Sequence, residues 1–314
     1  MKPKTTAFLF PGQGSQSVGM GQALAQQYPI ARETFQQADE ILGIPLTQLA
    51  WEGPEEKLND TINTQPALMV HSIAALRVLE QQFPEFTPAF VAGHSMGELS
   101  ALVAAKILPF EAALKLARRR GELMKQAGEI SPGGMAAILG LDIPTLDEIC
   151  AQASDENEIV QVANDNCPGQ VVISGAKPAL ERAMSLASEA GAKRVVPLAI
   201  SIAAHSPLMT HAQEGFNQAV EAAPIQTATI PLIGNVTAKP LRGEAEIRAD
   251  LQAQLRSRVR WTETIQFLQA QGIDTFVEIG NGEVLCGLVK RIDRQTQRFT
   301  LGSPEDFESF NPVS

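Results

Sequence analysis

Residues 93–98 read Gly-His-Ser-Met-Gly-Glu and carry the residue types that a nucleophilic serine needs. They follow an apolar run at 89–92 and open a small-residue segment, so the pattern predicts a strand, a tight turn and a helix, with Ser95 in the turn. Such an elbow strains the serine backbone, and a side chain at Gly93 or Gly97 would collide with the neighbouring strand and helix. The amides that begin the helix suit an oxygen that gains negative charge during acyl transfer. The alternative interpretation is a glycine-rich turn with a surface serine.

A histidine and a run of arginines could complete a site with this serine. His205 follows a run of small residues and precedes a predicted helix, a junction where catalytic groups often lie, although a lone loop histidine is more often an ordinary surface residue. Arg118, Arg119 and Arg120 fall on a helix predicted over 109–126. Neighbouring helix positions point about 100° apart, so the three cannot share one solvated face. At least one points elsewhere, and a pocket is a candidate direction.

The elements around these residues predict a large α/β domain. A buried strand at 7–10 ends in a glycine-rich loop, whose Gln13 could approach a ligand, although a plain strand-to-helix turn is the commoner meaning of such a loop. Thr64-Gln65-Pro66 predicts a helix start, because proline is tolerated in a first turn. Further strands are predicted at 230–236, 275–279 and 299–301, and the polar tail 303–314 is expected to be loose.

A second, smaller domain is predicted between the two halves of the first. Its elements alternate as strands at 135–139, 159–163, 170–174 and 194–198, with helices at 143–151 and 178–190. This β-α-β-β-α-β order is that of a ferredoxin-like α+β domain. We therefore expect an inserted domain at 131–199, and a discontinuous large domain made of 1–130 and 200–314.

The composition restricts the classes of partner and compartment. Of 314 residues, 44% are hydrophobic and 19% charged, as in a soluble globular protein, and the net charge of −10 argues against nucleic acid as the main partner. The short apolar stretch before Pro11-Gly12 leads us to expect neither a signal peptide nor a membrane span. Cys150, Cys167 and Cys286 are far apart with no metal-type spacing, so we expect reduced thiols in a cytoplasmic protein and no metal site.

Taken together, these segments resemble the malonyl-CoA:acyl carrier protein transacylases, the free-standing acyltransferases of fatty acid and polyketide synthesis. The resemblance runs from Thr6 to about Leu301, and its motifs are specific in their order and intervals. They are Phe10-Pro11-Gly12-Gln13-Gly14-Ser15-Gln16, Thr64-Gln65-Pro66-Ala67-Leu68, the 93–98 stretch, Arg120-Gly121, Asn164-Asp165-Asn166 with Pro168-Gly169-Gln170, Ala204-His205-Ser206, and Glu278-Ile279-Gly280. The fold this implies is a large α/β-hydrolase-like domain with a mostly parallel sheet and an inserted ferredoxin-like domain.

The resemblance also implies roles for individual residues. Ser95 matches the acylated nucleophile, His205 the general base, and the amides of Gln13 and Met96 the oxyanion hole. Arg120 matches the arginine that binds the malonyl carboxylate, for which a planar guanidinium fork is suited.

Other positions match residues around the substrate. Gln65 and Asn166 match substrate-binding residues. Ala204 occupies a position whose size influences whether a branched malonyl unit fits. In this family a backbone carbonyl orients the histidine, and we expect that carbonyl near 259–261.

The function implied is transfer of malonyl from malonyl-CoA, through a serine ester, to the phosphopantetheine thiol of holo acyl carrier protein. No cofactor, metal, nucleic acid or membrane is expected to take part, and we expect a monomer. A serine acyl hydrolase (thioesterase or esterase) using the same site is the alternative, although a carboxylate-binding Arg120 favours the transferase. A docking subunit without activity is the second alternative.

Basic groups at Lys115, Arg118 and Arg119, or at Lys290, Arg291 and Arg294, are candidate contacts for an acidic carrier protein.

Overall fold

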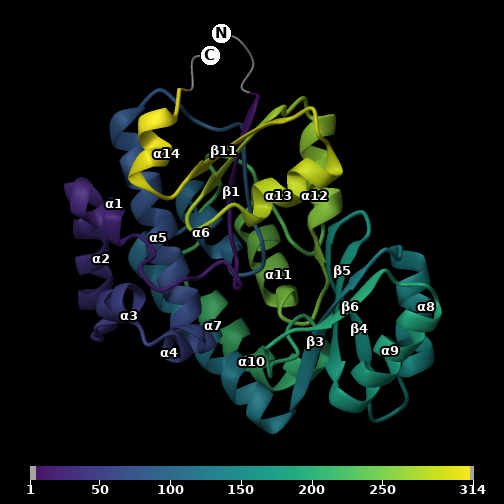
Figure 1. The fold of residues 1–314 in the computed structure, drawn as a ribbon. Coiled ribbons are helices and arrows are strands. Elements are labelled where there is room, and N and C mark those ends of the chain that lie inside the picture. The colour runs from purple at the N-terminus through teal and green to yellow at the C-terminus, as the bar shows by residue number, and fades with distance from the viewer. Residues whose placement is uncertain (1–4, 312–314) are drawn as a thin grey trace.

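The computed structural model describes residues 5–311, and its centre is a six-stranded sheet (Figure 1). The strand order is β11-β10-β1-β2-β7-β8, and every neighbouring pair is parallel except β7 and β8. The strands are β1 Thr6–Phe10, β2 Phe90–Gly93, β7 Leu232–Ile233, β8 Pro240–Leu241, β10 Thr275–Ile279 and β11 Gln297–Leu301. The predicted large α/β domain with a mostly parallel sheet is confirmed.

Helices cover both faces of this sheet because its central strands are apolar on both sides. In β1, Phe8 and Phe10 pack into one core while Ala7 and Leu9 pack into another, as alternate residues of a strand must. The first core includes α1 Gln22–Gln27, α2 Pro29–Leu42, α3 Leu46–Glu52, α4 Glu55–Asn59, α5 Thr61–Gln82, α6 Gly97–Ala104, α7 Phe110–Ile130, α10 Thr210–Ala222, α11 Glu244–Gln254 and α14 Pro304–Ser309. The second includes α12 Trp261–Ala270 and α13 Val284–Ile292.

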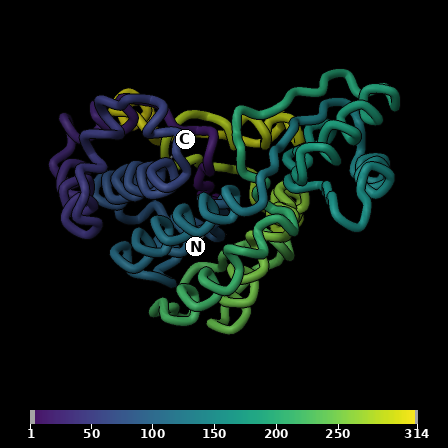
Figure 2. The backbone as a smooth tube through the Cα atoms, turned by 90° about the horizontal axis from the view of Figure 1, so that it is seen from below, coloured from purple at the N-terminus to yellow at the C-terminus, as the bar shows by residue number. Residues whose placement is uncertain are grey.

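A second sheet forms a separate lobe beside the first (Figure 2). Its order is β6-β3-β5-β4-β9, from β3 Gly133–Leu139, β4 Val160–Cys167, β5 Gln170–Ala176, β6 Arg194–Pro197 and β9 Val259–Arg260. The helices α8 Ile143–Ala153 and α9 Lys177–Glu189 pack on it around their own apolar core. The first four strands are antiparallel, which confirms the ferredoxin-like arrangement. β9 lies parallel to β4 and comes from outside 131–199, and that domain boundary stays a prediction.

The predicted helix start at 64–66 is wrong. Helix α5 begins at Thr61, where the Asp60 side chain accepts a hydrogen bond from the amide of Ile62, and Pro66 lies inside the helix. A proline there cannot donate to the carbonyl four residues earlier, that of Ile62. Arg118 Nη1 donates to this carbonyl at 3.2 Å instead, so a side chain of α7 satisfies the group that the proline leaves free.

Two further expectations were wrong, one about the strand at 230–236 and one about the tail at 303–314. The strand predicted at 230–236 is only Leu232–Ile233, because the chain turns at Gly234 to pair β7 with β8. The tail expected to be loose contains α14, which begins with a capping box between Ser303 and Asp306 and buries Phe307. Residues 312–314 of that tail lie outside the described residues. No helix within 5–311 is long and apolar enough to cross a membrane.

Candidate active site

Ser95 lies in the turn between β2 and α6, at the carboxyl edge of the parallel sheet. Its φ is 52°, the left-handed region that non-glycine residues rarely adopt. A Cβ on Gly97 would lie 2.1 Å from the carbonyl oxygen of Phe10, and one on Gly93 would lie 2.0 Å from that of Gly97. The predicted elbow, its strain and its two obligatory glycines are therefore confirmed.

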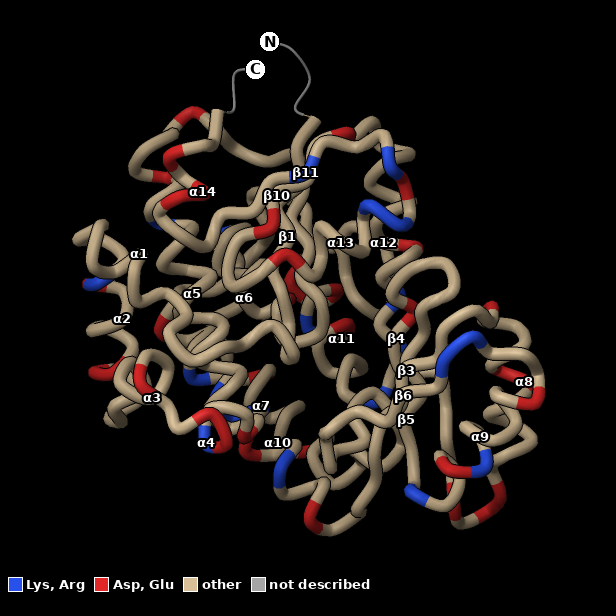
Figure 3. The backbone as a smooth tube through the Cα atoms, viewed as in Figure 1, with Lys and Arg blue, Asp and Glu red and all other residues tan. Residues whose placement is uncertain are grey.

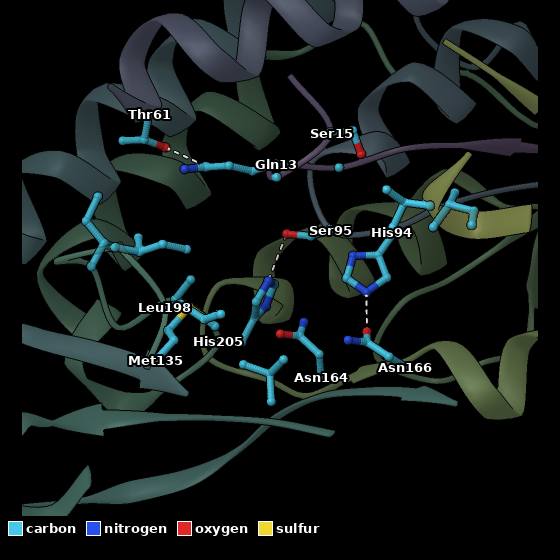
Figure 4. Close-up of a pocket in the computed structure, with 18 of the residues that line it drawn as sticks. Gln13, Ser15, Thr61, His94, Ser95, Met135, Asn164, Asn166, Leu198 and His205 are labelled. Carbon is cyan, nitrogen blue, oxygen red and sulfur yellow. Dashed lines mark hydrogen bonds between the residues drawn. The ribbon is translucent and has the colours of Figure 1, made fainter. Parts of the chain in front are cut away.

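His205 is brought against Ser95 from a distant part of the sequence. The distance from Ser95 Oγ to His205 Nε2 is 2.8 Å (Figure 4). His205 Nδ1 lies 2.9 Å from the carbonyl oxygen of Gln254, which can only accept, so the neutral ring carries its proton on Nδ1 and leaves Nε2 free to accept from the hydroxyl. The orienting carbonyl was expected near 259–261, and that was wrong. It belongs to Gln254, the last residue of α11, because terminal helix carbonyls have no partner within their own helix.

The imidazole of His205 is neutral at physiological pH. Burial lowers its pKa to about 3, and the positive charge of Arg120 adds to that effect. A neutral ring is the form that can accept a proton from Ser95, which is what a general base must do.

Arg120 is the arginine of the run that points inward. It is 1% exposed, and its guanidinium contacts Gln65 Oε1 through Nη1 at 2.9 Å, and through Nη2 it contacts Gln254 Oε1 at 2.8 Å and Ser95 Oγ at 3.1 Å. Burial lowers its pKa to about 10, which still leaves it charged at neutral pH. Arg118 and Arg119 instead pair with Glu122 near the surface. The prediction that the three arginines diverge is confirmed.

The glycine-rich loop after β1 lies directly over the elbow. A Cβ on Gly12 would be 2.4 Å from the carbonyl oxygen of His94, so only glycine allows this approach. Gln13, the next residue, lines the cavity together with Ser95, and its side chain extends toward Thr61, whose Oγ1 donates a hydrogen bond to Gln13 Oε1 at 3.0 Å (Figure 4). Met96 is the N-cap of α6, and the first amides of a helix have no intrahelical acceptors. Both positions are compatible with an oxyanion hole, a role that stays a prediction.

One cavity of about 230 Å³ joins these groups. Its polar end is formed by Gln13, Ser95, Arg120 and His205, and His94, Asn164 and Asn166 line another side. Its apolar wall combines Met124 of α7 with residues of the second lobe and the segment that follows β6, namely Met135, Val172, Leu198, Ile200, Ile202 and Ala204. The site therefore lies between the two sheets, with a charged end suited to a carboxylate and an apolar wall beside it.

The remaining predicted site residues occupy different positions around this cavity. Asn166 lines it and accepts at Oδ1 from His94 Nε2 at 2.8 Å, which links the second lobe to the elbow. Ala204 lines it as well. Gln65 is fully buried behind Arg120 and is not among the lining residues, so its observed contact is with the arginine. Its expected contact with substrate stays a prediction.

Three polar residues at the site were missed by the sequence analysis. Gln254 contacts His205 through its carbonyl and Arg120 through its side chain, and its Nε2 donates to the carbonyl of Ser95 and to the buried Glu98. Asn235 accepts a hydrogen bond from the amide of Ser95, and Gln161 donates one to the carbonyl of His205. A Gly-Asn turn signal exists at Asn235, whereas Gln254 and Gln161 lie in ordinary helix and strand sequence and carry no signal of their own.

Fold and site together define a class: α/β enzymes that move acyl groups through an ester on an elbow serine. The model of the acyl transferase domain family matches residues 7–299. The malonyl CoA-acyl carrier protein transacylase of Haemophilus influenzae is 48% identical over 310 residues, 99% of this chain and 98% of that protein. That of Bacillus subtilis is 46% identical over 302 residues, 96% and 95% of the two chains.

Solved structures of malonyltransferases resemble this chain over nearly its whole length. An acyl carrier protein S-malonyltransferase from Vibrio cholerae superimposes with a TM-score of 0.93 at 43% identity, covering 97% of this chain and 99% of that one. A malonyl-transacylase solved in complex with a holo type II PKS acyl-carrier protein gives 0.94 at 40% identity, covering 97% and 98%. This chain belongs to the malonyl CoA-acyl carrier protein transacylase family.

Proposed function

We propose that this protein transfers the malonyl group of malonyl-CoA, through an ester on Ser95, to the phosphopantetheine thiol of an acyl carrier protein. One observation carries the proposal. The hydroxyl oxygen of Ser95 is in contact with a neutral base, His205 Nε2 at 2.8 Å, and with a buried guanidinium, Arg120 Nη2 at 3.1 Å. A nucleophile beside a carboxylate-binding group fits an acyl chain that ends in a carboxylate.

In the first half-reaction the thioester carbonyl lies at Ser95 and the free carboxylate at Arg120. His205 takes the hydroxyl proton as Ser95 attacks, and the amides of Gln13 and Met96 stabilise the oxyanion. The C–S bond then breaks, and His205 returns the proton to the coenzyme A sulfur. The carboxylate also offsets the charge of Arg120, which is one cause of the low pKa of His205, so the base becomes stronger when malonyl is bound.

The second half-reaction reverses these roles. The thiol of the carrier protein gives its proton to His205, its sulfur attacks the ester carbonyl, and the Ser95 oxygen leaves and takes the proton back. The hydrolase alternative would use water here. Arg120 disfavours it, because a hydrolase of simple acyl chains needs no buried carboxylate-binding group. The second alternative, a docking subunit without activity, would not need Ser95, His205 and Arg120 to meet at one cavity.

For the carrier protein we propose docking at the basic end of α13. In Figure 3, basic residues lie at the end of this helix, where Lys290 and Arg291 occupy the last turn. The first turn of α13 lines the cavity through Val284, which is 49% exposed, so one helix runs from the cavity mouth to a basic surface. The other candidate surface, on α7, is less suited because Lys115 pairs with Glu111 and the arginines with Glu122.

The proposed chemistry uses no metal and no resident cofactor, since coenzyme A enters as part of the substrate. We propose a cytoplasmic monomer. The three cysteines are free and buried, as suits a reducing compartment. The exposed large hydrophobic side chains within 5–311, namely Val18, Ile130, Ile159 and Val284, come from separate elements, which supports a monomer.

Two measurements test this function. Intact-mass spectrometry after incubation with malonyl-CoA should show one malonyl group on the protein, none on Ser95→Ala, and normal labelling of Ser15→Ala, a control serine that lines the same cavity. Adding holo carrier protein should then move the label to the carrier. Release of free malonate without malonyl carrier protein would instead identify a hydrolase, and equal labelling of Ser95→Ala would remove the assigned nucleophile.

A further inference from the structure

Both reacting residues have a strained main chain. Ser95 has a φ of 52° and His205 a φ of 58°, and neither is glycine. Each such conformation costs on the order of 1–3 kcal/mol and persists only where its surroundings hold it. The contacts that hold these two backbones therefore decide whether Ser95 Oγ and His205 Nε2 stay at 2.8 Å.

Asn235 holds the backbone of the elbow. Its Oδ1 accepts from the amide of Ser95 at 2.7 Å and its Nδ2 donates to the carbonyl of Gly93 at 2.7 Å, so one side chain contacts both sides of the turn. Asn235 is 3% exposed, and its own amide donates to Glu98 Oε1 at 3.2 Å. Because Asn235 occupies the amide of Ser95, the next amide, that of Met96, is the one left for an oxyanion.

Gln161 holds the backbone of the histidine. It lies on β4 of the second lobe, and its Nε2 donates to the carbonyl of His205 at 2.7 Å and to that of Arg256 at 3.0 Å. Arg256 follows α11, the helix whose last carbonyl orients the His205 ring. One amide thus ties together the strained residue and the segment that orients its side chain.

We propose that Asn235 and Gln161 are positioning residues for acyl transfer, which hold the strained backbones of Ser95 and His205 and thereby set the contact between hydroxyl and imidazole. Neither side chain hydrogen-bonds to Arg120, whose partners are Gln65, Ser95 and Gln254, so neither acts through recognition of the malonyl carboxylate. The inference rests on the proposed function only in taking Ser95 and His205 as the reacting pair.

The test uses shape-matched substitutions that remove the hydrogen bonds. Asn235→Leu removes both contacts to the elbow, Gln161→Met removes both to the histidine segment, and Gln161→Glu keeps the shape while replacing the donor by a carboxylate. A displacement of about 1 Å at reacting atoms costs about 10²-fold. We expect single-turnover malonylation of Ser95 to slow by about 10- to 100-fold, with the KM for malonyl-CoA within about twofold of the original because Arg120 is untouched.

A second readout separates this inference from the proposed function. A fluorophosphonate reacts with an activated serine and has no malonyl carboxylate, so its inactivation rate should fall by the same factor in each variant even if the natural acyl group were different. Matched controls are Asn63→Leu and Gln269→Met, which remove amide donors to the carbonyl of Lys57 and to Asp293 Oδ2 away from the cavity and should leave both rates unchanged.

Melting curves and active-site titration give the folded fraction of each variant. The proposal is overturned if the folded fraction reacts with both reagents at the original rate, or if only the KM changes. Should Asn235→Leu fail to fold, the two Gln161 variants decide the outcome on the same criteria, since Gln161 is only partly buried and on a different sheet.

Discussion

Arg120→Ala should remove most of the preference for malonyl over acetyl groups. Arg120 is 1% exposed, and its Nη2 contacts Ser95 Oγ. This oxygen carries the acyl group in the proposed cycle. Its Nε has no hydrogen-bond partner within residues 5–311, and its Nη2 contact to the hydroxyl is free to be exchanged when the serine is acylated. The malonyl carboxylate, at the third carbon of the acyl group, can therefore accept hydrogen bonds from Nε and Nη2 of this buried guanidinium.

The magnitude follows from the hydrogen bonds that a carboxylate would make. A hydrogen bond to a charged group contributes about 1.5–3 kcal/mol, so two of them contribute about 3–6 kcal/mol. At 1.4 kcal/mol per tenfold, the loss corresponds to about 10²- to 10⁴-fold in relative kcat/KM. Acetyl has no carboxylate and should lose little.

The assay compares kcat/KM for malonyl-CoA and acetyl-CoA with the same holo carrier protein. Arg119→Ala is the matched control, because Arg119 is the preceding residue of the same helix, is exposed, and pairs with Glu122. Arg120→Ala also leaves Gln65 Oε1 and Gln254 Oε1 without their donor, so circular dichroism must show that the variant is folded. A ratio of the two kcat/KM values that stays within about threefold of the original, in folded Arg120→Ala, would refute the assigned carboxylate contact.

Three further outcomes are expected. Activity depends on neutral His205, whose pKa burial and Arg120 lower to about 3, so kcat/KM should stay level as pH falls from 8 to about 5; a decline centred on the ordinary value of 6.5 would contradict the buried base. Gly97→Ala places a Cβ 2.1 Å from a carbonyl oxygen and should unfold the elbow or abolish labelling, whereas Gly287→Ala, with nothing within 4 Å of its Cβ, should leave melting temperature and labelling unchanged or raise stability slightly. Lys290→Glu should slow transfer to the carrier protein and spare malonylation by malonyl-CoA, and an equal effect on both steps would place docking elsewhere.

The elements that could be predicted from sequence are those whose signal is local. The elbow is an example, since its strand, two glycines and helix are contiguous, and a Cβ on Gly93 would collide with the backbone of Gly97 inside the same turn. The ferredoxin-like lobe is another example, because its strands and helices follow one another in β-α-β-β-α-β order along one continuous stretch of sequence. The start of α5 was mispredicted because a residue of another helix, Arg118, satisfies the carbonyl that Pro66 leaves free, and no local pattern contains that contact.

By itself the sequence determined which side chains are available for chemistry and which turn presents the serine. The conformation of such a turn depends on a few consecutive residues, here Ser95 and its neighbouring glycines. Tertiary structure alone decided which carbonyl orients the imidazole and which side-chain amides hold the strained backbones. Gln254, Asn235 and Gln161 come from a helix, a turn and a second sheet, and each bonds to a residue 44 to 159 positions away. Hydrogen bonds act over about 3 Å, so only the packing of these elements onto one another brings donors and acceptors so distant in sequence within reach.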